Sequence, residues 1–295
     1  MKLLTINTHS LLEENYLQKL DWFVEGVLRE GPDLIAMQEV NQGADAPEPE
    51  PAALAGFVPL NGRQTVPVRR DNHAARVAGR LREAGVPCSW TWLPIKRGYE
   101  KYDEGVAVLS LGRSIVQTET FCISRRDDYR NWRTRKILGV RLREESDWYY
   151  TVHTGWWQDG EDPFVDQWSR LERAVSDRKD RGPVWLLGDF NAPAEFRGES
   201  YDHIRAAGWQ DAWLLAGNTG EGFTVEGVID GWRDRLAHPA RGLRMDHIWC
   251  SRSVPVVRAQ VLFDGKNGPK VSDHFGVLAE TEEPKKSEGE HHERV

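Results

Sequence analysis

Six short segments of the chain place carboxylate, amide or imidazole side chains beside apolar, strand-like runs. Carboxylates hold cations or accept protons, and imidazoles exchange protons near neutral pH, so these groups together can cleave an ester. Taken singly, each is equally well explained as a turn residue, a surface charge or a structural histidine. Their repetition at six strand ends predicts one catalytic centre. The residues concerned are Asn7, Glu39, His153, Asp189, Asn191, Asp246, Asp273 and His274.

These side chains need a scaffold of short strands, and apolar runs of the right length recur along the chain. They cover residues 2–7, 33–38, 105–110, 137–142, 148–153, 184–187, 247–250 and 277–280. Three further stretches, residues 15–30, 72–84 and 163–179, carry apolar residues at the spacing of a helix. Strands interleaved with surface helices predict two packed sheets with helices outside, a layered α/β sandwich. Periodicity leaves the strand order open.

Composition limits the classes of protein that the chain can be. With 295 residues, of which 39% are hydrophobic, we expect one domain over residues 1–281. Residues 282–295 contain a single apolar residue and are predicted to be a disordered tail. The formal charge of -7 argues against a protein that grips nucleic acid through a generally positive surface.

Cysteine usage and hydropathy indicate the compartment. Cys88, Cys122 and Cys250 are odd in number and widely spaced, so neither a disulfide framework nor a zinc site is predicted. No apolar run approaches the roughly 18 residues that span a bilayer. We therefore expect a cytoplasmic protein without membrane association.

The order of three motifs resembles the endonuclease/exonuclease/phosphatase superfamily: QE after a strand, then GDFN, then SDH. The resemblance runs from Lys2 to about Thr281 and implies a four-layered, deoxyribonuclease-like α/β sandwich. It also implies that Asn7 and Glu39 hold a divalent ion, with Asp273 as a further ligand or indirect partner. Magnesium suits such oxygen donors, and manganese is a possible substitute.

The same resemblance assigns roles to the remaining polar residues. Asp189 and Asn191 would orient the attacking water and bind the phosphate. His274 would contact the phosphate, with Asp246 fixing its tautomer. A second histidine-carboxylate pair would consist of His153 and Glu104. The sequence leaves open which histidine acts as acid and which as base.

A basic segment and several aromatic residues are candidates for substrate binding. Residues 125–136 hold six cations against two acids, and guanidinium groups bind phosphate well, although a solvated strand edge explains the same pattern. If this segment is a strand, Arg133 and Arg135 share one face, and Arg130 cannot join them. Indole and phenol rings near the motifs suit the apolar faces of a sugar. The predicted substrate-binding residues are Arg97, Tyr99, Arg130, Trp132, Arg133, Arg135, Trp156 and Trp157.

The stretch HTGWWQDGEDPFVDQW resembles a bacterial subgroup that includes maltose-6'-phosphate phosphatases. The resemblance implies a metal-dependent phosphatase that acts on a small sugar phosphate, with no stable nucleic-acid partner. An endonuclease or other phosphodiesterase with the same centre is the alternative, and a non-catalytic binding module is disfavoured because the motif residues are all present. The oligomeric state stays open.

Overall fold

The computed structural model describes residues 1–61, 66–227, 232 and 242–282. Its strands are β1 (Lys2–Asn7), β2 (Leu34–Gly43), β3 (Cys88–Gly98), β4 (Tyr102–Leu111), β5 (Ile115–Cys122), β6 (Lys136–Leu142), β7 (Trp148–His153), β8 (Val184–Asp189), β9 (Gln210–Asp211), β10 (Asp246–Cys250), β11 (Val256–Leu262) and β12 (Gly276–Thr281). Its helices are α1 (Tyr16–Glu30), α2 (His73–Glu83), α3 (Phe164–Lys179), α4 (Ser200–Ala206) and α5 (Ala212–Leu215), with short 3-10 turns at Ser10–Leu12 and Pro51–Leu54.

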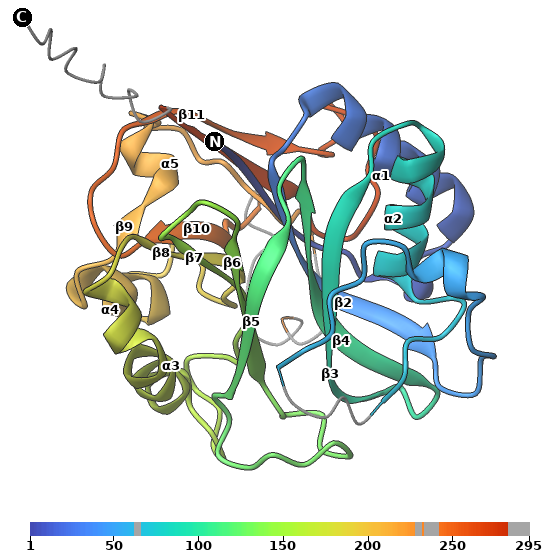
Figure 1. Ribbon diagram of the computed structural model, residues 1–295. Helices are drawn as coiled ribbons and strands as arrows, with labels where there is room; N and C mark the ends of the chain where they lie inside the picture. The colour runs from blue at the N-terminus through green and yellow to red at the C-terminus, as the bar shows by residue number, and fades with distance from the viewer. Residues whose placement is uncertain (62–65, 228–231, 233–241, 283–295) are drawn as a thin grey trace, which may run out of the picture.

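These strands form two mixed six-stranded sheets that face each other, with helices on their outer sides (Figure 1). The first sheet has the order β11-β12-β1-β2-β4-β3 and the second the order β5-β6-β7-β8-β10-β9. The layered α/β sandwich expected from the sequence is therefore confirmed. The strand order, which periodicity left open, places β1 and β2 inside one sheet and β7 and β8 inside the other.

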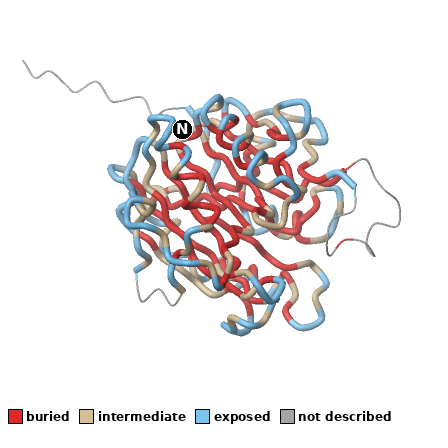
Figure 2. Tube along the Cα trace, turned by 90° about the vertical axis from the view of Figure 1, so that its right-hand side faces the viewer, coloured by how far each residue is buried: buried red, intermediate tan, exposed pale blue. Residues whose placement is uncertain are grey.

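Apolar layers hold the sandwich together. Between the sheets, Leu3 and Leu34 of the first sheet share a core with Leu138 and Leu187 of the second. Each sheet also packs its outer face against helices, α1 and α2 on the first and α3 and α4 on the second. Figure 2 shows buried segments of the chain running through the centre, with exposed segments mainly on the outside.

Helix α1 illustrates how the sequence produces this packing. Leu20, Phe23, Val24 and Val27 lie three or four positions apart, so they form one buried face. The helix ends at Gly31, whose φ of 60° is a left-handed conformation that favours glycine. Its N–H donates to the Val27 carbonyl, 2.9 Å away.

Hydrogen bonds between polar side chains join the two sheets near the carboxyl ends of strands β1 and β7. Gln38 of β2 donates from Nε2 to Thr151 Oγ1 of β7 at 2.8 Å, and its side chain also lies within 3.4 Å of Thr5 Oγ1. All three side chains are buried. A buried amide is costly unless it is hydrogen-bonded, so this link disfavours sliding of one sheet over the other.

The elements expected from the sequence are all present, with bounds that differ by a few residues. Strands β3, β5, β9 and β11 and the short helices α4 and α5 were not anticipated. In the described part of the chain, no helix combines the length and the apolar character that a membrane span requires. Residues 283–295, most of the predicted disordered tail, lie outside the described residues.

Candidate active site

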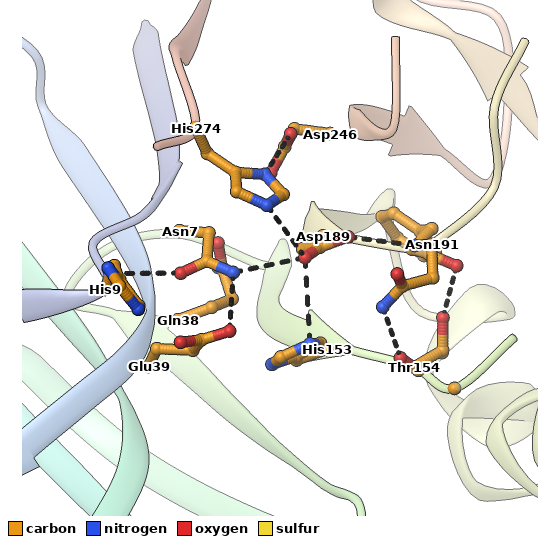
Figure 3. A network of polar contacts seen from close by, with 12 residues as sticks. Asn7, His9, Gln38, Glu39, His153, Thr154, Asp189, Asn191, Asp246 and His274 are labelled. Carbon is orange, nitrogen blue, oxygen red and sulfur yellow. Dashed lines mark hydrogen bonds and ion pairs between the residues drawn. The ribbon is translucent and has the colours of Figure 1, made fainter. Parts of the chain in front are cut away.

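Strand pairing gathers the polar strand ends at one edge of the sandwich. β1 runs parallel to β2, which puts Asn7 opposite Gln38. β7 runs parallel to β8, which puts His153 opposite Asp189. β10 runs antiparallel to β8 and begins at Asp246, also opposite Asp189. Figure 3 shows the resulting network, to which both sheets contribute.

Glu39 enters the network through an irregularity in β2. The pairing of β2 with β4 shifts register between Met37 and Val40, and Glu39 has a φ of 50°. A non-glycine residue in this left-handed region is strained, and such strain concentrates at functional sites. The irregularity leaves the Glu39 carboxylate 2.9 Å from Asn7 Nδ2, at the rim of the sheet.

Asn7 connects the two sheets at the centre of the site. Its Nδ2 donates to Glu39 Oε1 and, at 3.1 Å, to Asp189 Oδ2 (Figure 3). Its Oδ1 accepts from the His9 N–H at 3.1 Å. Asn7 therefore positions two carboxylates from opposite sheets, and its Oδ1, which keeps a second lone pair, is the side-chain atom able to ligate a cation.

His274 and Asp246 form the histidine-carboxylate pair expected from the sequence. His274 Nδ1 lies 2.9 Å from Asp246 Oδ2, and both residues are buried. This contact fixes the ring, so that Nε2 points toward Asp189 Oδ2 at 3.8 Å. On the other side of Asp189, His153 Nε2 lies 3.6 Å from the same oxygen. One carboxylate thus stands between two imidazoles.

The expected pairing of His153 with Glu104 is not what the structure shows. Glu104 Oε1 instead forms an ion pair with Lys96 Nζ at 3.0 Å, and both side chains are buried. β3 and β4 pair antiparallel with Lys96 opposite Glu104, so the lysine is the nearer partner. Asp189 takes the place that the sequence interpretation gave to Glu104.

The two imidazoles differ in charge. Burial opposes a positive charge on His274, but the Asp246 and Asp189 carboxylates outweigh it and raise the pKa of His274 well above its ordinary value. Burial, together with Arg135 and Lys96 nearby, lowers the pKa of His153 well below its ordinary value. His274 is therefore cationic and His153 neutral, a distinction that the sequence left open.

The carboxylates also depart from their usual protonation. Burial raises the pKa of Asp189 to about 6, with His274 acting in the opposite direction. Burial, reinforced by Glu104 and then Asp273, raises the pKa of Glu39 to about 7. The carboxylates of Glu39, Glu104 and Asp273 thus crowd one region, and this excess of negative charge fits a cation bound by oxygen donors.

A cavity of about 350 Å³ opens onto this network. Its walls contain most of the residues named above and five of the predicted substrate-binding residues: Arg97, Tyr99, Trp132, Arg135 and Trp156. Trp132 and Trp156 form a tilted aromatic pair with ring centroids 5.8 Å apart. Acidic, basic and aromatic side chains therefore line one space.

Three predicted substrate-binding residues do not line this cavity. Arg133 pairs with Asp159 Oδ2 at 3.2 Å, and the Arg130 side chain is exposed on a turn. Trp157 packs against Phe164 instead of facing the cavity. The expectation that Arg133 and Arg135 share a strand face was wrong because β6 begins only at Lys136 and the preceding residues form turns, where side chains do not alternate.

Two titratable residues of the cavity wall were missed in the sequence analysis. His9 follows β1, has a φ of 46° and contacts Glu13 Oε1 through Nδ1 at 2.8 Å. Its Nδ1 also lies 4.0 Å from Asp273 Oδ1. Lys96 is the second missed residue. His9 lies two residues after Asn7, and Lys96 directly precedes Arg97, so their position beside predicted site residues was a signal that could have identified them.

The comparison with known families agrees with this geometry. The family model described as Endonuclease/Exonuclease/phosphatase family matches residues 4–274. Among curated proteins, no match to this chain is found. Among solved structures, the chain is similar to an endonuclease/exonuclease/phosphatase family protein from Leptotrichia buccalis, with 26% identity and a TM-score of 0.80 over 96% of this chain and 100% of that one.

Two further structures share the fold at lower identity. A mannosyl-6-phosphatase from Bacteroides thetaiotaomicron has 16% identity and a TM-score of 0.62, over 96% of this chain and 100% of that one. A 3' phosphatase from Neisseria, bound to a product DNA hairpin, has 21% identity and a TM-score of 0.61 over the same shares. Since the family model spans nearly the whole described chain, the protein belongs to the endonuclease/exonuclease/phosphatase family, whose members are hydrolases that act on phosphoesters.

Proposed function

We propose that the protein is a metal-dependent phosphomonoesterase that releases inorganic phosphate from a small sugar phosphate, such as the disaccharide phosphate maltose 6'-phosphate. The observation that carries this proposal is the position of the Trp132–Trp156 pair in the same cavity as Asp189 and His274. Aromatic faces bind the apolar faces of sugar rings, and the cavity volume of about 350 Å³ lies at the size of small-ligand sites.

The chain's own residues suit hydrolysis of a phosphate placed in this cavity. Asp189, held by Asn7 and by the N–H of Asn191 at 2.9 Å, can orient a water and accept its proton. His274 Nε2 can donate to a phosphoryl oxygen while Asp246 holds the other ring nitrogen. Asn191 Nδ2 donates to the Thr154 carbonyl at 3.0 Å, which fixes its amide beside the same space.

A divalent cation fits the donor set around Glu39 and Asp273. Both carboxylates line the cavity, and a cation would offset the burial and the neighbouring negative charge that raise the pKa of Glu39. When bound, magnesium or manganese supplies positive charge that stabilises the developing charge on phosphoryl oxygens. Asn7 contributes by aligning Glu39 through Nδ2, and its Oδ1 is directed to the His9 N–H.

The experiment is a phosphate-release assay across one substrate panel. We expect maltose 6'-phosphate or mannose 6-phosphate to be cleaved faster than an abasic DNA duplex or a 3'-phosphorylated DNA hairpin. Activity requires magnesium or manganese and is lost in excess chelator. Faster cleavage of abasic DNA would assign the protein to the nucleases, and full activity in chelator would refute the metal requirement.

Tryptophan variants test the sugar-binding wall separately. Trp132→Ala and Trp156→Ala are expected to raise KM for a disaccharide phosphate several-fold more than KM for a minimal aryl phosphate, because only the disaccharide reaches the wall. Trp157→Phe is the matched control, since Trp157 packs against Phe164 outside the cavity. Equal losses on both substrates would remove the argument for a sugar wall.

A further inference from the structure

Arg135 is a buried cation that forms no direct ion pair with a described residue, although the carboxylates of Glu104, Glu39 and Asp189 act on it from a greater distance. Its residue surface is only 5% exposed, although it reaches the wall of the cavity. Among the described residues, its guanidinium donates only from Nη1, to the carbonyls of Trp132 at 3.1 Å and Thr134 at 3.3 Å. Its Nε is buried and has no hydrogen-bond partner there. Within the same residues, no carboxylate forms an ion pair with it.

The neighbouring cations differ from Arg135 in this respect. Lys96 has Glu104 as its partner, at 3.0 Å. Arg133, two residues before Arg135, pairs with Asp159 at 3.2 Å. A buried guanidinium without a direct ion pair is costly, so an anion that enters from the cavity would stabilise it. The cavity that Arg135 lines is the place from which such an anion can reach it.

We infer that Arg135 is the receptor for a terminal phosphoryl oxygen and selects dianionic phosphomonoesters over phosphodiesters. The inference rests on the proposed function and deepens it by naming the feature of the substrate that is recognised. A guanidinium presents a planar fork of donors that matches two oxygens of one phosphate. Among the described residues, Nη2 has no hydrogen-bond partner and, unlike Nε, is not fully buried, so it is the donor that an incoming phosphoryl oxygen can reach.

The number of terminal oxygens explains the selectivity. A monoester has three such oxygens and a diester has two. His274 and Asn191 line the same cavity and can donate to the other phosphate oxygens. A monoester leaves a charged terminal oxygen for Arg135, whereas a diester directs an esterified oxygen and its carbon substituent toward the buried guanidinium. An esterified oxygen is uncharged and a poor acceptor, so a diester does not form the charge-assisted hydrogen bond with Arg135.

The first test measures binding without catalysis. Inorganic phosphate is titrated into the magnesium-loaded enzyme and into Arg135→Gln by calorimetry. We expect Arg135→Gln to weaken phosphate binding by about 10- to 100-fold, the range for losing charge-assisted hydrogen bonds. Arg126→Gln is the matched control, because it removes the same charge from an exposed position of the same segment. Unchanged phosphate affinity in folded Arg135→Gln would overturn the inference.

The second test measures selectivity. The ratio of kcat/KM for an aryl phosphate to that for the corresponding bis-aryl phosphate is expected to fall at least about tenfold in Arg135→Gln, and to recover in part in Arg135→Lys, which restores the charge but not the fork. A ratio that stays constant contradicts the inference. The results distinguish the Arg135 proposal from the proposed substrate. If Arg135→Gln loses phosphate affinity but the wild-type enzyme turns over no sugar phosphate, the proposed substrate is refuted and the role of Arg135 is not.

Discussion

At the scale of residues, the site is a carboxylate held between two imidazoles of unequal charge. Asp189 Oδ2 lies 3.6 Å from His153 and 3.8 Å from His274. His274 owes its positive charge to Asp246, whereas His153 remains neutral beside Arg135. The two imidazoles therefore have different protonation states at the same pH. His274 can donate a proton, while neutral His153 can form hydrogen bonds near the same carboxylate.

We expect Asp189→Asn and His274→Ala each to lower kcat by at least about a hundredfold, the usual scale for losing a positioned proton carrier. Asp246→Asn should have a smaller effect, because it misorients His274 without removing it. Steady-state kinetics on a sugar phosphate, with circular dichroism to verify folding, provide the measurement. Asp202→Asn serves as the control, since Asp202 pairs with the exposed Arg197. Near-normal turnover in folded Asp189→Asn would show that the centre lies elsewhere.

Motifs located the central residues well, because a polar group at the end of an apolar strand has a defined direction. Asn7, Asp189 and His274 do meet, as expected. The sequence could not give the direction of side chains in turns, which is why Arg133 was assigned to the substrate. Nor could it show that Lys96 opposes Glu104, because that contact depends on the register between two strands.

At the scale of elements, a buried histidine joins the two helices that cover the first sheet. His73 is the first residue of α2 and is only 4% exposed. Its Nδ1 lies 3.0 Å from the Tyr16 hydroxyl at the start of α1. Burial, with Arg76 adding to the effect, lowers the pKa of His73 to about 3. The packing of α1 against α2 therefore requires a neutral imidazole.

This requirement predicts acid sensitivity. The unfolded chain takes up a proton on His73 below about pH 6.5, but the folded chain does so only near pH 3, so stability falls as pH decreases through that window. Between pH 6.5 and 4.5, the free energy of unfolding should fall by about 2 kcal/mol more in the wild type than in His73→Gln, which cannot titrate. Urea denaturation at both pH values measures the difference. Parallel losses in the two proteins would contradict the prediction.

The strands that sequence patterns missed share a place in the fold. β11 and β3 are the edges of the first sheet, and β5 and β9 are the edges of the second. Central strands buried on both faces form continuous apolar runs, whereas edge strands carry polar residues that discourage pairing with other chains. β3 even contains Pro94, which a sheet tolerates at an edge. The polar, exposed positions of β5 and β11 therefore explain their weak signal, whereas in β3 the proline interrupts an otherwise apolar run.

At the scale of the whole molecule, the site exists only where the sheets meet. The first sheet provides Asn7 and Glu39, and the second provides His153 and Asp189. The link from Gln38 to Thr151 lies just below these residues and connects the same strands. A displacement between the sheets would separate the two halves of the site before either sheet lost its own hydrogen bonds.

The path of the chain through the two sheets has a consequence for how the gene can be rearranged. Strands β1 to β4 build one sheet, the chain then builds the other, and β11 and β12 return to the first. The Met1 amino group consequently donates to the Thr281 carbonyl at 3.0 Å.

A circular permutant that joins Glu282 to Met1 through a short glycine-serine linker, with new ends between Gly112 and Arg113, would make each sheet one uninterrupted stretch of sequence. Gly112 and Arg113 are exposed, and ends placed at such positions are well tolerated. We expect the permutant to keep kcat within about threefold of the original chain, because the connection that is cut, residues 112–114, contributes no side chain to the cavity. A folded permutant without turnover would mean that the connection from β4 to β5 holds the two halves of the site in register.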